Sequence, residues 1–444
     1  MMKTLCMLCL SLCWINLAYA VPQVQQHTLK NGVHVLLIEA HHVPMLAMQL
    51  TMPAGSRFDA EGKGGSAALL SALLLDHTRK SNHVDWAAQL DDAAIRLSAG
   101  VDQDALTLSL TVLEEAVDEG VEAMAEALLS PGWQRKRFAL LKDNALAAAH
   151  KAQEEAGTQA AQAVVELLFP QHPYGHVVGG SLTSLNKVKL KDLKRLYQQQ
   201  VKPQGATLAV SGDITMAALI PLLEKVLGHW QGQPKIALAD IPQAIASDVM
   251  QKNIIMQKHQ SLLTWVRHGP SRHDKDYMAS LVLNHILGGG GFGSRLMEEV
   301  REKRGLTYGV YSWFQPLETS GTYTIRLQTR ADQANEAEQV IEAVLTELAA
   351  GKITADMLKK TQQNLSGGFA QRMDSNRERA GLLSMMGLYH RPLNYLQNWT
   401  QSVESVTLAD VKRLAKLYLQ PQSWKRIRVG PASVHKHEHK KGDV

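Results

Sequence analysis

One internal repeat constrains the fold of this chain more than any other feature of the sequence. Residues 188–204 read VKLKDLKRLYQQQVKPQ and residues 406–422 read VTLADVKRLAKLYLQPQ, so the copies match without a gap at an offset of 218 residues (406 minus 188). At the same offset Gly212 coincides with Gly430. Each copy predicts a helix, a proline turn and a strand. The chain is therefore expected to fold as two homologous halves.

The repeat and the proline positions together predict where the halves begin and end. We expect the halves to span residues 21–231 and 247–431. Residues 232–246 lie between them and contain two prolines that interrupt regular structure, so this stretch predicts a linker. Residues 432–444 are rich in histidine and lysine and predict a disordered tail.

Strands and helices come in runs within each half rather than alternating along the chain. This grouping predicts an α+β fold, in which each half is a mostly antiparallel sheet with helices packed on one face. In the first half we expect strands at 31–40 and 43–56 joined by a turn at His41–His42, a helix at 65–77, a strand pair within 95–113, and long helices through 114–168. The second half repeats this plan.

The first twenty residues have the pattern of a secretory signal peptide. Lys3 is followed by an apolar run, and Ala18-Tyr19-Ala20 fits a cleavage site after Ala20. A lipoprotein anchor at Cys13 is the weaker alternative, because a bulky leucine precedes it. All three cysteines lie inside this segment, so the remaining chain offers no disulfide and no thiolate ligand. We expect export to a bacterial periplasm, and no membrane span, because no later apolar run reaches about 18 residues.

The charge balance does not point to nucleic acid as a partner. The formal net charge is +5, and no basic run is interleaved with aromatic residues. The densest basic patch, at 187–195, has apolar residues at helical spacing and is more typical of a solvated helix face. With 45% hydrophobic and 20% charged residues, the composition is that of an ordinary soluble protein.

The stretch 286–312, ILGGGGFGSRLMEEVREKRGLTYGVYS, carries the most chemical information in the chain. Its run of consecutive glycines allows positive φ angles and close approach to another molecule. No Gly-Lys-Ser/Thr follows the run, so it is not a phosphate-binding loop. The glycines that could line a binding surface are Gly288, Gly289, Gly290 and Gly291. A plain loop beside a solvated helix is the alternative interpretation.

A helix and a strand are expected directly after these glycines. The helix would run from Ser294 to Gly305, where glycine suits a left-handed cap, and the strand would cover 306–314. Arg301 near the helix end and Tyr308 on the strand would then lie close together. A cation and a phenol beside a glycine surface could hold a peptide or an oxyanion.

Several features together resemble the pitrilysin/insulinase-type zinc peptidases, the M16 family, which includes the mitochondrial processing peptidases. They are the duplicated plan, the segment AGSR at 54–57, the turn HPYG at 172–175, and above all the span 287–311. The resemblance covers nearly all of the chain after residue 20. It implies the metallopeptidase fold shared by LuxS and the mitochondrial processing peptidases.

The resemblance also indicates where a zinc site would lie. Zinc in this family is bound by an inverted His-x-x-Glu-His motif on the first helix after the opening strands, together with a distant glutamate. The corresponding segment here is GGSAALLSALLLDHT, at 64–78. On this alignment the motif positions hold Ala68, Ser71 and Ala72, and the distant glutamate falls on or close to Ala148. The resemblance therefore implies that this chain holds no metal of its own.

Neighbouring side chains do not offer a replacement zinc site. Asp76 and His77 are adjacent, so on a helix they point about a hundred degrees apart and cannot chelate as an i, i+4 pair would. His150, Glu154 and Glu155 are expected on a later helix, with no partner facing them from the first.

Some members of the family work as pairs, in which one subunit carries zinc and the other has lost the motif but keeps an Arg-x6-Tyr pair. Arg301 and Tyr308 have this spacing. The resemblance therefore implies a non-catalytic partner subunit, with zinc in a homologous catalytic subunit and an extended or unfolded peptide as substrate. Arg301 and Tyr308 would act in trans on the substrate, and the glycines would line the channel.

Two other interpretations stay open. The chain could be a stand-alone peptide-binding or scaffold protein without proteolytic activity. It could also be an independently active peptidase, which would require zinc in the purified single chain.

Overall fold

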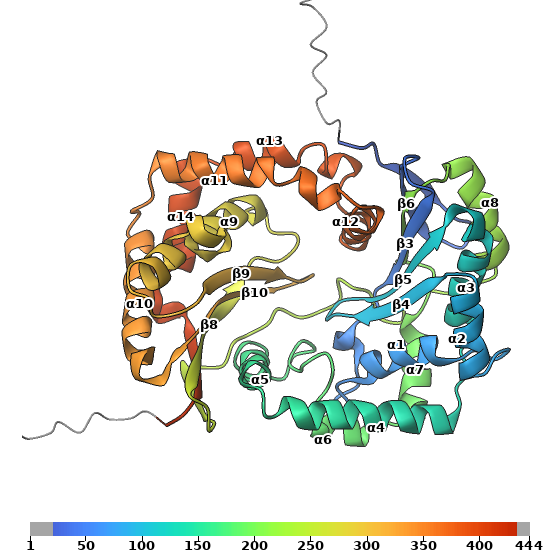
Figure 1. Ribbon diagram of the computed structural model, residues 1–444, viewed down its shortest axis with the longest axis horizontal. Coiled ribbons are helices and arrows are strands. Elements are labelled where there is room, and N and C mark those ends of the chain that lie inside the picture. Colours follow the sequence, from blue (N-terminus) through green and yellow to red (C-terminus); the bar gives the residue numbers. More distant parts are fainter. Residues whose placement is uncertain (1–20, 433–444) are drawn as a thin grey trace, which may run out of the picture.

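The computed structural model describes residues 21–432. The expected signal peptide at 1–20 and residues 433–444 of the expected tail lie outside the described residues. The described part of the chain forms two sheets, each with its own set of helices, that face each other across the middle of the molecule (Figure 1). No helix between residues 21 and 432 is long and apolar enough to cross a membrane.

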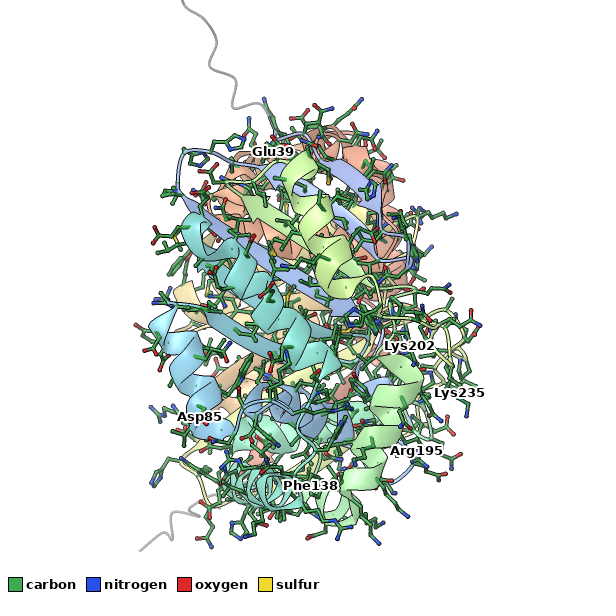
Figure 2. The ribbon with its side chains drawn as sticks, turned by 90° about the vertical axis from the view of Figure 1, so that its right-hand side faces the viewer. Glu39, Asp85, Phe138, Arg195, Lys202 and Lys235 are labelled. Carbon is green, nitrogen blue, oxygen red and sulfur yellow. The ribbon has the colours of Figure 1, made fainter. Side chains whose placement is uncertain are left out.

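The first sheet has the strand order β1-β2-β6-β3-β5-β4. Its outer face is covered by helices and carries buried apolar side chains such as Leu46, Met48 and Leu50. Figure 2 shows this helix-covered side. The strands are β1 (Gln25–Thr28), β2 (His34–Glu39), β3 (Met45–Met52), β4 (Arg96–Val101), β5 (Leu106–Leu113) and β6 (Thr207–Gly212). The helices of this half are α1 (Ser66–Asp76), α2 (His83–Asp92), α3 (Val117–Leu129), α4 (Arg135–Ala152), α5 (Ala156–Leu168), α6 (Leu182–Lys187), α7 (Leu190–Gln200) and α8 (Met216–Leu227).

The second sheet has the order β7-β11-β8-β10-β9. Between α8 and this sheet, residues 228–250 contain no helix or strand. The strands are β7 (Gln251–Ile255), β8 (Gln260–Gly269), β9 (Val310–Pro316), β10 (Gly321–Arg330) and β11 (Lys425–Gly430). The helices are α9 (Tyr277–Asn284), α10 (Ala334–Ala349), α11 (Ala355–Gly367), α12 (Asn376–Leu388), α13 (Trp399–Glu404) and α14 (Leu408–Tyr418).

The expected α+β class is confirmed, with each sheet mostly antiparallel. Each sheet also contains one parallel pair, β2 with β6 and β7 with β11. The two opening strands are joined by a turn at His41–His42, as predicted, but they do not pair with each other as a hairpin. β6 lies between β2 and β3, parallel to the first and antiparallel to the second. All six residues of β6 are buried, so it is a central strand rather than an edge.

The repeat found in the sequence is present in the structure, element by element. α7 and α14 coincide at the same offset, and so do β6 and β11. Both helices also begin in the same way, because an aspartate at the third helical position accepts a hydrogen bond from the backbone N–H before the helix. The distances are 2.9 Å from Lys189 N to Asp192 Oδ2 and 3.1 Å from Thr407 N to Asp410 Oδ2.

The basic patch at 187–195 lies mostly on α7. Leu193 and Leu196 of this helix are buried in the core of the first half. Arg195 lies on the outer surface, where Figure 2 labels it, with 52% of its side chain exposed. The patch is the solvated helix face that the spacing predicts.

The two halves exchange one helix each. α5 of the first half packs against the second sheet, where its Ala160 and Ala163 join a cluster with Val266 and Ile427. α12 of the second half packs against β6, β3 and β2 of the first sheet (Figure 1). We call these sheet surfaces, opposite the main helix layers, the inner faces. Each inner face is therefore partly covered by a helix from the other half.

Candidate functional site

The glycine-rich stretch folds as two π-helical segments joined by a tight turn. α9 continues directly into a π-helical segment at His285–Gly289, and a second one follows at Met297–Glu302. The second segment lies inside the helix predicted from Ser294. Gly305 ends it with a φ of +63°, the left-handed conformation predicted for this position. π-helical segments are uncommon and occur frequently at functional sites.

The strand predicted at 306–314 begins later, because β9 starts at Val310. Tyr308 therefore lies in a bend before the strand, and its predicted place on the strand is wrong. The hydroxyl of Thr307 explains the bend, since it accepts a hydrogen bond from Gly309 N at 3.2 Å and donates one to Gln328 O at 2.7 Å. This local bonding replaces the ladder that a strand would need.

The four predicted glycines do not have the same surroundings. Gly288 is buried, and a Cβ there would lie 2.7 Å from the backbone nitrogen of Ser312, so glycine lets the first π-helical segment rest directly on β9. Gly289 is exposed, whereas Gly290 and Gly291 are half-buried. Gly291 has a φ of +58°, which favours glycine. Gly288 thus serves internal packing, and the other three reach the surface.

Arg301 lies between two aromatic rings at this surface. Its guanidinium carbon is 4.6 Å from the centroid of the Phe292 ring and 5.6 Å from that of Tyr308. Both rings face solvent, with 67% of Phe292 and 93% of Tyr308 exposed. The structure therefore brings Arg301 and Tyr308 together and adds Phe292, which the sequence interpretation missed. An aromatic residue inside a glycine run was the available signal.

The charge of Arg301 is not neutralised by its neighbours. The guanidinium of Arg301 forms no ion pair or hydrogen bond with any residue from 21 to 432, whereas Lys303 and Arg304 pair with Glu299 at 2.7 and 2.8 Å. The hydrogen bonds from these two cations hold the pKa of Glu299 at about 2, so its carboxylate stays ionised and bound to Lys303 and Arg304. Arg301 is left with donors that can bind a peptide carbonyl or carboxylate.

The positions that align with the zinc motif lie on α1 and α4. Ser71 is buried, and its hydroxyl donates to the carbonyl of Ala68 at 2.8 Å. Ala72 and Ala148 are exposed, and alanine has no atom that can bind a metal. The residues at these positions therefore do not fit zinc. Within residues 21–432, no group of three or more His, Cys, Asp or Glu side chains is arranged to hold a metal ion.

Asp76 and His77, at the end of α1, form a buried structural network. Arg137 donates to both oxygens of Asp76, at 2.8 and 2.5 Å, and His77 Nδ1 lies 2.7 Å from the same carboxylate. Burial raises the pKa of Asp76, but the hydrogen bonds from Arg137 and His77 outweigh it and hold this pKa below its usual value. His77 is fully buried, so neither side chain is open to a ligand.

Two motifs that suggested the family meet at a single buried carboxylate. Arg57, from AGSR, and Tyr174, from HPYG, donate to Asp104 Oδ1 at 2.8 and 2.6 Å. From the second half, the backbone N–H of Glu318 and the hydroxyl of Tyr389 donate to Asp104 Oδ2 at 2.9 and 3.0 Å. Asp104, bonded to both motif residues on one oxygen, therefore joins the first half to the second through the other oxygen.

Comparison with known proteins agrees with this geometry. Residues 34–179 match a family described as insulinase, peptidase family M16, and residues 187–365 match the peptidase M16 inactive domain. A crystal structure of a peptidase M16 inactive domain from Pseudomonas fluorescens superposes with a TM-score of 0.86 at 30% identity, covering 92% of this chain and 98% of that one. The chain belongs to the M16 peptidase family, and the predicted resemblance is confirmed.

The relatives include one named as a non-peptidase and others named as zinc proteases. A non-peptidase homolog, YmxG, from Helicobacter pylori is 23% identical over 390 residues, covering 87% of this chain and 89% of that protein. The zinc protease PqqE from the same species is 22% identical over 421 residues, covering 90% and 91%. In this chain, the residues at the zinc-motif positions cannot bind the metal. This chain is therefore an inactive member of the family when alone.

Proposed function

We propose that this chain is the non-catalytic subunit of a two-chain zinc peptidase, paired with a homologous subunit that carries zinc. One observation carries the proposal. An unpaired arginine is displayed between two exposed aromatic rings, on a chain whose own zinc-motif positions cannot bind the metal. Such a group has a catalytic use only if the peptide is cleaved on another chain.

The surface has the donors that such a role needs. The partner's zinc would polarise the scissile carbonyl and activate water. The guanidinium of Arg301 would donate hydrogen bonds to a peptide carbonyl and stabilise the oxyanion that develops from it. The hydroxyl of Tyr308 would donate beside it, and Phe292 would hold the guanidinium in place by stacking. Gly289, which is exposed and has no side chain, would let the peptide backbone approach closely.

The comparisons support pairing indirectly. Helicobacter pylori has both a relative named as a non-peptidase homolog and a relative named as a zinc protease. A second chain with an intact motif in the same cell is what the proposal requires. The signal-peptide pattern at 1–20 leads us to propose the periplasm as the place where the pair acts.

The test is reconstitution with a homologue from the same genome that carries His-x-x-Glu-His. We expect neither chain alone to cleave an unfolded peptide and the mixture to cleave it. Arg301→Ala should lower kcat of the complex about 100-fold, the cost of removing one oxyanion donor. Arg304→Ala is the matched control, because Arg304 lies on the same turn but binds Glu299, and its complex should keep full activity.

A complex that forms and works equally well with Arg301→Ala would overturn the in-trans role. The alternative, a peptide-binding protein without a catalytic partner, is favoured by the same exposed rings and cation. It would be supported if the chain binds peptides but no homologue with an intact motif gains activity from it.

A further inference from the structure

A pocket of about 590 Å³ lies on the inner face of the first sheet, outside the glycine-rich surface. Its floor is made by β3, β5 and β4, and one wall is the beginning of α12, with residues 374–377 and 379. The floor therefore comes from the first half of the chain and the wall from the second. The pocket exists only because the halves exchange this helix.

The wall is fixed to the sheet by hydrogen bonds of one side chain. Asn376 Nδ2 donates to the carbonyl of Met45 on β3 at 3.1 Å, and Ser211 Oγ on β6 donates to Asn376 Oδ1 at 3.2 Å. These bonds position the first turn of α12 relative to the strands, so the pocket is preformed.

The floor of the pocket carries small polar side chains beside apolar ones such as Met45 and Ala47. Along β5, Leu108 and Leu110 are buried toward the outer helices, whereas Ser109 and Thr111 alternate with them and are half-buried on the pocket side. Gln49 of β3 adds an amide beside them. The floor can therefore hydrogen-bond a ligand without filling the space.

Positive charge around the pocket is left without an anionic partner. Arg96 on β4 and Arg377 on α12 are exposed, and neither guanidinium forms an ion pair or hydrogen bond with another described residue. The guanidinium of Arg379 donates to the Met373 carbonyl at 2.7 Å and to Asn376 Oδ1 at 2.8 Å, which are neutral groups. Three arginines thus line the pocket with their charges unneutralised.

The carboxylates nearby do not cancel this charge. Asp374 lines the pocket but forms no ion pair with a described residue. Glu378 accepts hydrogen bonds from the backbone nitrogen and the hydroxyl of Ser375, both at 3.0 Å, and does not line the pocket. The start of α12 adds the positive end of a helix dipole. An anionic group is therefore the ligand that this surface complements.

We propose that this pocket binds acidic side chains of an extended peptide, with Arg96 and Arg377 contacting the carboxylates. The inference rests on the proposed function, because the occupant is the peptide that the pair would cleave, and it names the substrate class as peptides rich in Asp or Glu. Arginine suits this role because its planar donors match a carboxylate in pairs. The pocket would select among peptides, while Arg301 would act at the cleaved bond.

The experiment measures peptide binding to the purified single chain by titration calorimetry. Three nine-residue peptides share one sequence except at alternate positions, which hold Glu, Gln or Lys. Alternate positions are chosen because they fall on one side of an extended chain. We expect the Glu peptide to bind about tenfold more tightly than the Gln peptide, and the Lys peptide to bind most weakly. This order should weaken with added salt.

Variants assign the binding to the pocket. Arg96→Ala and Arg377→Ala should each weaken binding of the Glu peptide about fivefold, the loss expected for one partly exposed ion pair. Arg135→Ala is the matched control, because the Arg135 side chain is also exposed and has no ion pair or hydrogen bond with a described residue, but it lies on α4 outside the pocket. It should leave the affinity unchanged.

The inference is overturned if the Glu peptide does not bind, if the three peptides bind alike, or if neither pocket variant weakens the Glu peptide. These outcomes differ from failure of the proposed function, which is judged by the activity of the two-chain complex and by Arg301→Ala. If the complex needs Arg301 but cleaves Glu and Gln peptides equally, the role of the pocket is contradicted and the paired peptidase is supported. If the chain binds the Glu peptide selectively but no homologue gains activity from it, the proposed pocket is supported and the paired peptidase is contradicted.

Discussion

The hydroxyl of Tyr389 donates a hydrogen bond of 3.0 Å to the carboxylate of Asp104, although the two residues are 285 positions apart. Both side chains are buried. With Arg57 and Tyr174 on the other oxygen, the carboxylate is surrounded by donors from both halves. A buried charge is tolerated only when it is paired and hydrogen-bonded. The contact between the halves at Asp104 therefore depends on each of the groups that donate to its carboxylate.

Replacing this carboxylate should destabilise the whole protein. Asp104→Asn removes the charge that balances the buried Arg57 and turns an amide N–H₂ toward other donors. We expect the free energy of unfolding to fall by about 3 kcal/mol, measured by urea denaturation. Glu61→Gln, at an exposed residue that forms no ion pair with another described residue, should change it by less than about 0.5 kcal/mol. A loss below about 1 kcal/mol for Asp104→Asn would contradict the account.

Two glycines of α12 should respond in opposite ways to the same substitution. A Cβ at Gly387 would lie 2.2 Å from Thr207 Cγ2, so Gly387→Ala should push α12 away from β6 and destabilise the protein by about 2 kcal/mol. A Cβ at Gly381 would meet nothing nearer than Gln49 Nε2 at 3.8 Å. Gly381→Ala should therefore stabilise the helix by about 0.5 kcal/mol or more. Equal effects in thermal unfolding would show that α12 does not pack as described.

The glycine-rich stretch offers a second matched pair. Gly288→Ala places a Cβ 2.7 Å from Ser312 N, so we expect a loss of about 2 kcal/mol in unfolding free energy and a displaced Arg301. A Cβ added at Gly293 would meet no neighbouring atom within 4 Å, and Gly293 does not have a positive φ. Gly293→Ala should therefore leave the free energy of unfolding almost unchanged. Similar stability of the two variants would argue against close packing on β9.

The Asp76 network predicts a pH dependence. Because the pKa of Asp76 is lowered on folding, its stabilisation is present above its usual value of 3.8 and is lost as the pH falls through the lower folded value. Asp76→Asn should cost about 3 kcal/mol at pH 7, and this difference from the unmodified protein should shrink toward pH 3. Asp92→Asn, at an exposed carboxylate, should show no such trend. A constant difference from pH 7 to pH 3 would be evidence against the network.

Metal removal should have no effect on the chain alone. Since Ala68, Ser71, Ala72 and Ala148 do not provide a ligand set, thermal unfolding should be the same with and without a chelator. The histidine-rich tail could bind metal weakly, so a chain ending at residue 432 is the control. About one zinc per chain in that shortened protein, lost with the chelator, would restore the independently active peptidase as the function.

The sequence predicted those parts of the fold that depend on local pattern. The repeat placed α7 with α14 and β6 with β11, because each copy carries its own capping aspartate and strand. It did not predict that β6 lies between β2 and β3. An apolar strand is recognisable as buried, but its neighbours depend on long-range pairing that local sequence does not encode.

The candidate site also combines features that local sequence predicts with features that depend on long-range packing. The Arg301 and Tyr308 spacing could be read directly, whereas the position of Tyr308 in a bend depends on the hydroxyl of Thr307, which competes with the strand. The pocket was not predicted, because it needs α12 to cross to the other half. An amphipathic helix shows which side is apolar, but not which sheet that side meets.

The helix exchange has a consequence for how the chain would tolerate cleavage. Because α5 and α12 each cover a sheet of the other half, the peptide connection between Leu227 and Gln251 is not what keeps the halves together. A protease cutting there would produce two fragments that remain bound as a noncovalent pair, as in a domain-swapped dimer. Native electrophoresis would show one species and denaturing electrophoresis two.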